Sequence, residues 1–305
     1  MNRTSLDHGI KPTPADVTCV LSAKAQIGEG PVWSVAEQLL YWADIVGKQL
    51  NAFDPVTGIN QVTELPELVT SIAPRAKGGL ILTLRSSFAF FDPKTKKLEK
   101  IAEPEPDKPA NRFNDGKTDR QGRMWGGTMG DVDWDKPVGS LYRMGADLKP
   151  VRVEEGICCS NGLGWSPDSK TMYFTESFAY RIWAYDFDAA TGNISNRRVF
   201  LKLDPHESAF PDGLTVDAEG YVWSAQPMFG RLARYAPDGR LDRVIELPVS
   251  RGTSAMFGGP NLDILYVTTM RLTLSEAQLA EEPLAGSLLA LKPGVRGVAE
   301  TPFAG

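Results

Sequence analysis

The chain has 305 residues, with 33 Lys or Arg, 38 Asp or Glu and a formal net charge of -5. Its 42% hydrophobic and 23% charged residues predict a globular domain and exclude a disordered chain, collagen and a coiled coil. The mildly acidic balance, without clusters of Lys and Arg, argues against nucleic acid or an anionic membrane as the main partner. No apolar run approaches the roughly 18 residues that a membrane-spanning helix needs.

The N-terminal residues 1–16 carry one Arg, no apolar segment and two prolines, Pro12 and Pro14. This composition is typical of a loose arm and does not indicate a secretory signal. We therefore expect an arm over residues 1–19, followed by a single domain over residues 20–305.

Cysteine and histidine are scarce. The three cysteines, two of them adjacent at Cys158 and Cys159, make no disulfide framework and predict a cytoplasmic protein. The two histidines are His8, in the expected arm, and His206, in what reads as an exposed loop. A His-rich zinc site is therefore excluded, and the chemistry must use carboxylates, amides, Arg or an oxygen-bound metal. Without a base partner, Cys158 and Cys159 are interpreted as buried structural thiols.

Short runs of aromatic and β-branched residues recur along the chain at intervals of 40 to 50 residues. The second residue of each run is a large apolar anchor: Tyr41, Ile81, Trp125, Tyr173, Trp223 and Tyr266. Between the runs lie clusters of Asp, Pro and Gly, such as residues 119–122 and 217–220, which are typical of turns between antiparallel strands. A helical turn or two is expected only around residues 275–281.

Six units of this length account for nearly the whole chain. Repeats of about 40 to 50 residues that each contain several short strands indicate a β-propeller. The predicted fold is therefore all-β, a six-bladed β-propeller. The alternative is an irregular pair of β-sandwiches, which would also contain many short strands but would not require so even a repeat.

The innermost strands of a propeller line one central channel, so residues at equal phase in different repeats should meet there. Eleven or twelve positions before the anchors lie Glu29, Asn114, Asn161 and Asp212, each followed within two residues by Gly. The same count gives Ser254 in the sixth repeat and Val69 and Thr70 in the second. Four of the six positions therefore carry side-chain oxygens of the kind that bind metals.

Two interpretations of these positions remain. Asn161-Gly162 and Asp212-Gly213 are also the dipeptides of tight hairpin turns, but Glu29-Gly30 followed by Pro is not such a turn. Two carboxylates and two amides predict a central site for one divalent cation, with calcium first and magnesium or manganese next. Zinc uses such ligands less often.

Several motifs resemble the gluconolactonase, regucalcin and senescence-marker-protein family. They are GEGPVWS (residues 28–34), RFNDGKTD (112–119), GTM (127–129), SNGLGWS (160–166), NISNRR (193–198), PDGL (211–214) and the closing segment 297–305. The resemblance runs from about residue 20 to the end of the chain. It implies a six-bladed propeller that holds one divalent cation in its central channel and hydrolyses sugar lactones to sugar acids. By this resemblance Glu29, Asn161 and Asp212 bind the metal, and Arg112 and Asn114 contact the substrate.

Two segments depart from the family pattern. After residues 127–129 many relatives carry a substrate-binding Glu, and here Asp131 and Asp133 are the candidate substitutes. After Trp223 the run Ser-Ala-Gln-Pro-Met-Phe-Gly replaces the small residues that are usual in the family. Both differences concern recognition of the sugar, so they bear on the identity of the substrate more than on the metal.

Opening a lactone requires a polarised carbonyl, an activated water and stabilisation of an oxyanion. We expect the cation to act as a Lewis acid, Asp212 to act as general base, and Arg112 and Asn114 to orient the ring. One alternative is an organophosphate or aryl-ester hydrolase that uses the same metal channel. The other is a calcium-binding propeller without catalysis. The expected partner is a small sugar lactone, and the expected assembly is a monomer or a weak homo-oligomer.

Overall fold

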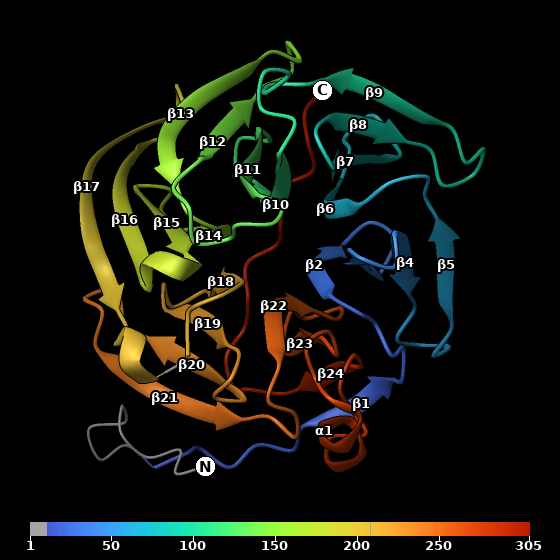
Figure 1. Ribbon diagram of the computed structural model, residues 1–305, viewed down its shortest axis with the longest axis vertical. Coiled ribbons are helices and arrows are strands. Elements are labelled where there is room, and N and C mark those ends of the chain that lie inside the picture. The colour runs from blue at the N-terminus through green and yellow to red at the C-terminus, as the bar shows by residue number, and fades with distance from the viewer. Residues whose placement is uncertain (1–10, 208) are drawn as a thin grey trace.

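The computed structural model describes residues 11–207 and 209–305. These residues form six four-stranded antiparallel sheets, arranged as blades around a central axis (Figure 1). The prediction of a six-bladed β-propeller is therefore confirmed, and the alternative pair of sandwiches is wrong.

Each blade is named in chain order, and its strands run from the channel outward. Blade one contains β2 (Gly28–Ser34), β3 (Leu39–Asp44), β4 (Gln49–Phe53) and β5 (Asn60–Glu64), and blade two contains β6 (Val69–Pro74), β7 (Leu80–Leu84), β8 (Phe88–Phe91) and β9 (Leu98–Ala102). Blade three contains β10 (Asn111–Thr118), β11 (Met124–Gly130), β12 (Gly139–Met144) and β13 (Pro150–Ile157), and blade four contains β14 (Ser160–Trp165), β15 (Thr171–Glu176), β16 (Arg181–Asp188) and β17 (Asn193–Lys202). Blade five contains β18 (Leu214–Val216), β19 (Val222–Gln226), β20 (Arg231–Tyr235) and β21 (Leu241–Glu246), and blade six contains β22 (Gly252–Gly258), β23 (Ile264–Thr269), β24 (Leu288–Leu291) and β1 (Thr18–Leu21).

All six anchor residues lie in the second strand of their blades, and each is at most 3% exposed. They fill the space between neighbouring blades, as the 6.2 Å between the ring centroids of Trp223 and Phe257 shows. Two of the expected turns add a polar support for an anchor. Asp119 accepts the indole N–H of Trp125 at 3.0 Å, and Asp217 accepts that of Trp223 at 2.9 Å. The repeat seen in the sequence is thus the repeat of the hydrophobic core.

The ring is closed by strands from the two ends of the described chain. β1 is the outermost strand of blade six and pairs with β24, which comes from the C-terminal part. The expected arm over residues 1–19 is therefore too long, because Thr18 and Cys19 already belong to β1. The N–H of Thr13 donates to the carbonyl of Val244 at 2.7 Å, so contact with the propeller begins earlier still. His8 lies outside the described residues.

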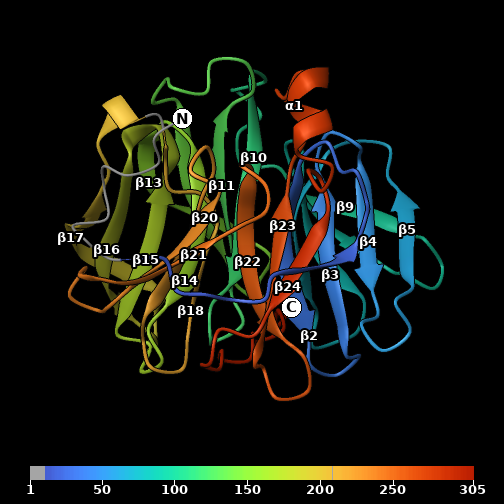
Figure 2. The ribbon, with the colours of Figure 1, turned by 90° about the horizontal axis from the view of Figure 1, so that it is seen from below.

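The few helical segments lie in loops between strands. α1 (Glu276–Glu281) falls where a helical turn was predicted and begins at a capping box formed by Ser275 and Gln278. The two 3₁₀ turns are η1 (Ser177–Ala179) and η2 (Pro205–Glu207). Figure 2 shows α1 standing on one face of the disc. In the described part of the chain, no helix has the length and apolar character needed to cross a membrane.

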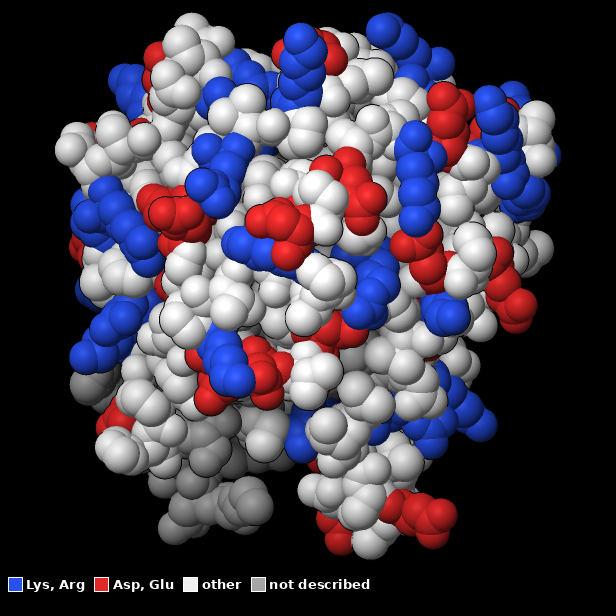
Figure 3. All heavy atoms as spheres, turned by 45° about the horizontal axis from the view of Figure 1, so that its top comes forward, with Lys and Arg blue, Asp and Glu red and all other residues white. Residues whose placement is uncertain are grey.

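Lys and Arg are interspersed with Asp and Glu on the face of the molecule shown in Figure 3. No block of positive charge of the kind that binds a nucleic-acid backbone is visible on that face.

Candidate active site

Three of the innermost strands are interrupted by β-bulges at corresponding points. The pairing register shifts between Glu29 and Val32 in β2, between Phe113 and Gly116 in β10, and between Ser160 and Leu163 in β14. Glu29 borders its bulge, and Asn114 and Asn161 lie within theirs. Bulges redirect side chains next to functional sites, so the shared phase seen in the sequence corresponds to a shared backbone irregularity.

Asp212 lies two residues before Leu214, where the inner strand of blade five begins. Its N–H donates to the carbonyl of Ala225 at 3.0 Å. The glycines that follow Asn161 and Asp212 are needed for close packing: a Cβ on Gly162 would lie 2.4 Å from the nitrogen of Leu214, and one on Gly213 would lie 2.0 Å from Oγ of Ser254. Neither glycine has the positive φ that a type I′ hairpin turn requires. The interpretation of these dipeptides as hairpin turns is therefore wrong.

A cavity of about 380 Å³ lies where the inner strands converge. Its charged and amide side chains are Glu29, Arg112, Asn114, Asn161, Asp212 and Arg251. Leu272 and Thr273, which lead toward α1, also line it, so the cavity lies toward the α1 face of the disc. The structure thus brings all four phase-matched residues and Arg112 to one cavity.

Three carboxylates are buried around this cavity without an ion pair in the described residues. Glu29, Asp115 and Asp212 are each 6% exposed, and none forms an ion pair within the described residues. Burial, followed by repulsion from Asp212 and Asp115, holds the pKa of Glu29 well above its usual range. Burial and repulsion from Asp115 raise the pKa of Asp212 in the same way. The carboxylates lower the electrostatic potential of the cavity and would be stabilised by a cation.

Asn161 supplies a buried oxygen that lacks a hydrogen bond. Its Nδ2 donates to Oγ of Ser177 at 2.9 Å, and that hydroxyl donates to the carbonyl of Pro211 at 2.7 Å. This chain of hydrogen bonds fixes the amide orientation, while Oδ1 of Asn161 is buried and accepts no hydrogen bond from residues 11–207 or 209–305. No three His, Cys, Asp or Glu side chains converge as metal ligands in the described chain. A hard cation would therefore be held by Glu29, Asp212 and the amide oxygen of Asn161, a donor set that suits it.

Arg112 and Asn114 bind each other at the cavity wall. Nη1 of Arg112 donates to Oδ1 of Asn114 at 2.8 Å and to the carbonyl of Phe113 at 2.9 Å. Nδ2 of Asn114 donates to the carbonyl of Ser160 at 2.8 Å. Both ends of the Asn114 amide are thus occupied, and its contribution is to orient Arg112 and to join blades three and four.

Asp131 and Asp133, the two candidate substitutes for a substrate-binding Glu, lie in different places. Oδ1 of Asp131 pairs with Nε of Arg112 at 3.0 Å, and its Oδ2 pairs with Arg85 at 2.5 Å. Asp131 therefore supports Arg112 without lining the cavity itself. The Asp133 side chain is 55% exposed and pairs with Lys136. The structure does not bring Asp133 to the cavity.

The remaining phase-matched positions do not add acidic ligands. In blade two, Oγ1 of Thr70 shares a hydrogen bond with Oγ1 of Thr83. In blade six, Ser254 packs against Gly213, and its neighbour Thr253 lines the cavity instead. The bulge in β22 falls between Gly252 and Ser254, so a count of residues alone misses the inward position by one.

Sequence reasoning missed three residues that belong to this region: Asp115, Ser177 and Arg251. Asp115 could have been found, because it adjoins Asn114 at the same phase. Ser177 comes from η1 and carries no repeat signal. Arg251 precedes the bulge of β22 as Arg112 precedes that of β10, and this correspondence becomes visible only after the bulges are known.

No hydrogen bond in the described residues joins a cysteine to His206. Cys159 is buried, its Sγ lies 3.5 Å from Sδ of Met129, and burial raises the pKa of its thiol. Burial also raises the pKa of Cys158, which is partly exposed. His206 lies exposed in η2, and it does not line the cavity. The buried thiol of Cys159 matches its interpretation as a structural residue.

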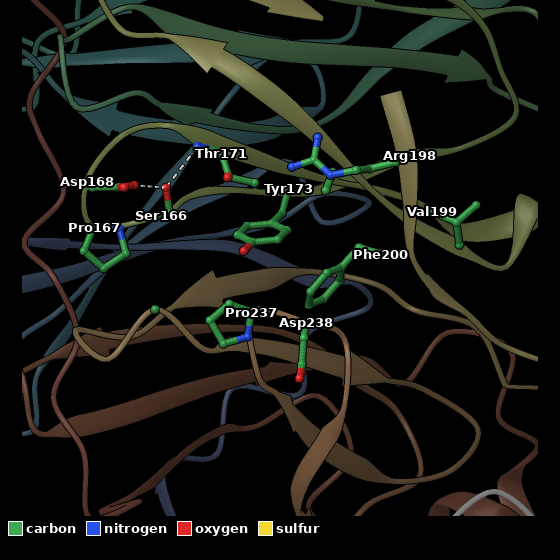
Figure 4. Close-up of a pocket in the computed structure, with 12 residues that line it drawn as sticks. Ser166, Pro167, Asp168, Thr171, Tyr173, Arg198, Val199, Phe200, Pro237 and Asp238 are labelled. Carbon is green, nitrogen blue, oxygen red and sulfur yellow. Dashed lines mark hydrogen bonds between the residues drawn. The ribbon is translucent and has the colours of Figure 1, made fainter. Parts of the chain in front are cut away.

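A second hollow, of about 510 Å³, lies between blades four and five (Figure 4). Tyr173 and Phe200 pack edge to face within it, with ring centroids 4.8 Å apart. Ser166 donates to Asp168 at 2.6 Å, within the turn that follows β14. None of the predicted site residues lines this hollow. The central cavity is therefore the candidate active site.

Comparison with known proteins identifies the family. Residues 27–271 match the model of the SMP-30/Gluconolactonase/LRE-like region. Regucalcin of Gallus gallus is 37% identical over 295 residues, covering 95% of this chain and 98% of that protein. 6-Deoxy-6-sulfogluconolactonase of Pseudomonas putida is 36% identical over 287 residues, covering 94% and 98%.

A solved structure supports the same assignment. The calcium-binding protein regucalcin of Agrobacterium tumefaciens strain C58 superposes with a TM-score of 0.89 and 28% identity, over 96% of this chain and 97% of that one. The match of the family model covers the whole of the four blades that carry or adjoin Glu29, Arg112, Asn161 and Asp212. This chain belongs to the SMP-30/gluconolactonase/LRE-like family.

Proposed function

We propose that this protein is a divalent-cation-dependent lactone hydrolase that opens a sugar lactone to the sugar acid. The observation that carries the proposal is a cluster of buried carboxylates that form no ion pair in the described residues. They accompany Oδ1 of Asn161, which is buried and accepts no hydrogen bond there. Glu29, Asp212 and Asn161 would hold the ion, with calcium as the first candidate. The relatives named regucalcin and 6-deoxy-6-sulfogluconolactonase support a cation and a sugar lactone, respectively.

Each residue has a distinct role in this proposal. A cation bound by the oxygens of Glu29, Asp212 and Asn161 would supply a Lewis acid for the lactone carbonyl. Asp212 takes the proton of the attacking water on its carboxylate, which accepts no side-chain hydrogen bond within the described residues. Arg112, held by Asn114 and Asp131, donates to the lactone oxygens and fixes the ring in the cavity.

The proposal is tested by following acid release from an aldonolactone at constant pH, with calcium, magnesium, manganese or zinc added to metal-depleted protein. We expect hydrolysis well above the spontaneous rate with at least one cation, and a bound stoichiometry of one ion per chain. A protein that binds one ion tightly and hydrolyses no lactone would be a calcium-binding propeller without this activity.

Arg112→Ala should lower kcat/KM for the lactone by about 10- to 100-fold, because hydrogen bonds from charged groups contribute roughly 1.5–3 kcal/mol. The cation content should stay at the wild-type level. The matched control is Arg85→Ala. This substitution also removes a partner of Asp131, but Arg85 does not line the cavity. We expect the control to remain within about threefold of wild type, and equal losses in both variants would contradict a substrate contact by Arg112.

An aryl ester is a second candidate substrate because aromatic rings line one side of the cavity. The ring centroids of Trp134 and Phe178 are 6.3 Å apart, and those of Phe178 and Phe210 are 5.4 Å apart. The three rings come from blade three, from η1 and from the segment before β18, and all line the cavity. Comparing kcat/KM for an aldonolactone and for a phenyl ester decides between the two substrate classes.

A further inference from the structure

Arg251 is a second buried guanidinium in the cavity wall, and the lactone chemistry above does not use it. It directly precedes β22 in blade six, lines the cavity and is only 7% exposed. Burying a positive charge is costly unless a partner compensates for it. The surroundings of Arg251 therefore show whether its charge is compensated within the fold or is available to bind a ligand.

Arg251 lacks the partners that Arg112 has. Arg112 pairs with Asp131 and donates to Asn114 and a backbone carbonyl. Within the described residues, in contrast, Nε of Arg251 is buried with no hydrogen bond, and its Nη1 contacts the thioether sulfur of Met228. No ion pair to Arg251 occurs within the described residues.

The nearby Glu282 does not fill this gap. Its Oε2 accepts hydrogen bonds from the N–H and the hydroxyl of Ser250, at 2.6 and 3.0 Å. A thioether is a weak acceptor, so Met228 cannot compensate for the charge either. The guanidinium of Arg251 is thus a buried donor that faces a cavity without an acceptor of its own.

The two arginines lie on opposite walls. Each directly precedes the bulge of its inner strand, Arg112 in blade three and Arg251 in blade six. Figure 1 shows β10 and β22 on opposite sides of the propeller axis. A ligand that fills the cavity between them can therefore contact Arg112 at one end and Arg251 at the other.

We propose that Arg251 binds an anionic group at the end of the substrate remote from the lactone ester. The preferred substrate is then a lactone that bears a terminal carboxylate, sulfonate or phosphate. A guanidinium fork binds such groups through two parallel hydrogen bonds, and burial strengthens the pairing. This inference rests on the proposed lactone hydrolysis, and it specifies the class of lactone.

The test compares an aldonolactone with the matched aldarolactone, in which a carboxylate replaces the terminal CH₂OH group. Wild-type protein should show a kcat/KM at least about tenfold higher for the aldarolactone. Arg251→Met should lose at least about tenfold more on the aldarolactone than on the aldonolactone. Arg251→Lys keeps the charge without the fork and should give an intermediate preference. Arg152→Met, at an exposed position on β13, controls for the loss of one positive charge and should alter neither rate.

Binding of the product acids gives a second measurement that does not need turnover. Calorimetry should show aldarate binding more tightly than aldonate to wild type, and this difference should disappear in Arg251→Met. Equal losses on both lactones, or an unchanged difference in acid binding, would overturn the role of Arg251. If neither lactone is hydrolysed but aldarate is still preferred through Arg251, the anion site stands and the proposed lactone hydrolysis fails.

Discussion

Asp212→Asn should lower kcat for lactone hydrolysis by about 100- to 10,000-fold, the usual effect of removing a general base. The asparagine keeps an oxygen that can bind a cation, but it cannot accept a proton from water. Asp212 is 6% exposed at the cavity wall. Its backbone N–H donates to the carbonyl of Ala225 and so fixes the residue before β18. We therefore expect cation affinity to weaken only partly while kcat falls steeply. Steady-state kinetics, with cation content measured in parallel, check both expectations.

The matched control is Asp115→Asn. Asp115 is equally buried and raises the pKa of Asp212, but it does not line the cavity. Its substitution should shift the pH profile of kcat toward lower pH, because Asp212 then ionises more easily, while the maximal rate changes by much less than in Asp212→Asn. If Asp212→Asn turns over near the wild-type rate with normal cation content, Asp212 is not the base. A water ionised by the cation alone would then be the preferred nucleophile.

The periodic part of the molecule could be predicted from the sequence because each repeat in the sequence corresponds to one blade of the structure. Each anchor occupies the same place between neighbouring blades, so the spacing between successive anchors gives the length of a blade. A fixed number of residues before each anchor lies the inner strand of its blade. Glu29, Asn114, Asn161 and Asp212 were found for this reason, and all four line the cavity. The helix at α1 was predicted from a short helical pattern around residues 275–281, and in the structure it begins at a capping box.

The features that could not be predicted depend on loops and bulges, which do not follow the repeat of 40 to 50 residues. The bulge in β22 brings Thr253 and not Ser254 to the cavity. Asp133 lies two residues from Asp131, yet only Asp131 reaches Arg112, because the loop after β11 turns outward to solvent between them. The closure of blade six by β1 pairs Thr18 with Ala290, and no local pattern encodes such a distant contact.

Removing the cation should abolish turnover while the fold survives. The six blades bury their cores away from the channel, so the circular dichroism spectrum should not change in a chelator, unlike that of a zinc finger. Turnover should fall by at least about 100-fold and return when the cation is added back. Full activity in chelator, or collapse of the spectrum, would contradict a cation that acts in catalysis alone.

The chelated protein should also lose stability as the pH rises. Burial and mutual repulsion raise the pKa of Glu29 and Asp212 in the folded state above the value near 4 that such groups have when unfolded. The folded chain therefore binds more protons than the unfolded chain between these pKa values. Its free energy of unfolding falls as the pH rises through this window, and the loss is complete above the raised pKa values.

Glu29→Gln separates this electrostatic cost from other effects of pH. In chelator at pH 8 the variant should have a higher Tm than wild type, because it removes one of the repelling charges, and at pH 4 the two should converge. A difference of about 1 kcal/mol corresponds to roughly 2–4 °C in domains of 150–250 residues. With saturating calcium the order should reverse, since only wild type keeps both carboxylate ligands. Glu103→Gln, at an exposed position, is the control and should follow wild type throughout. A Tm difference that is the same at both pH values, or that calcium does not reverse, would show that Glu29 is not a cation ligand held under charge repulsion.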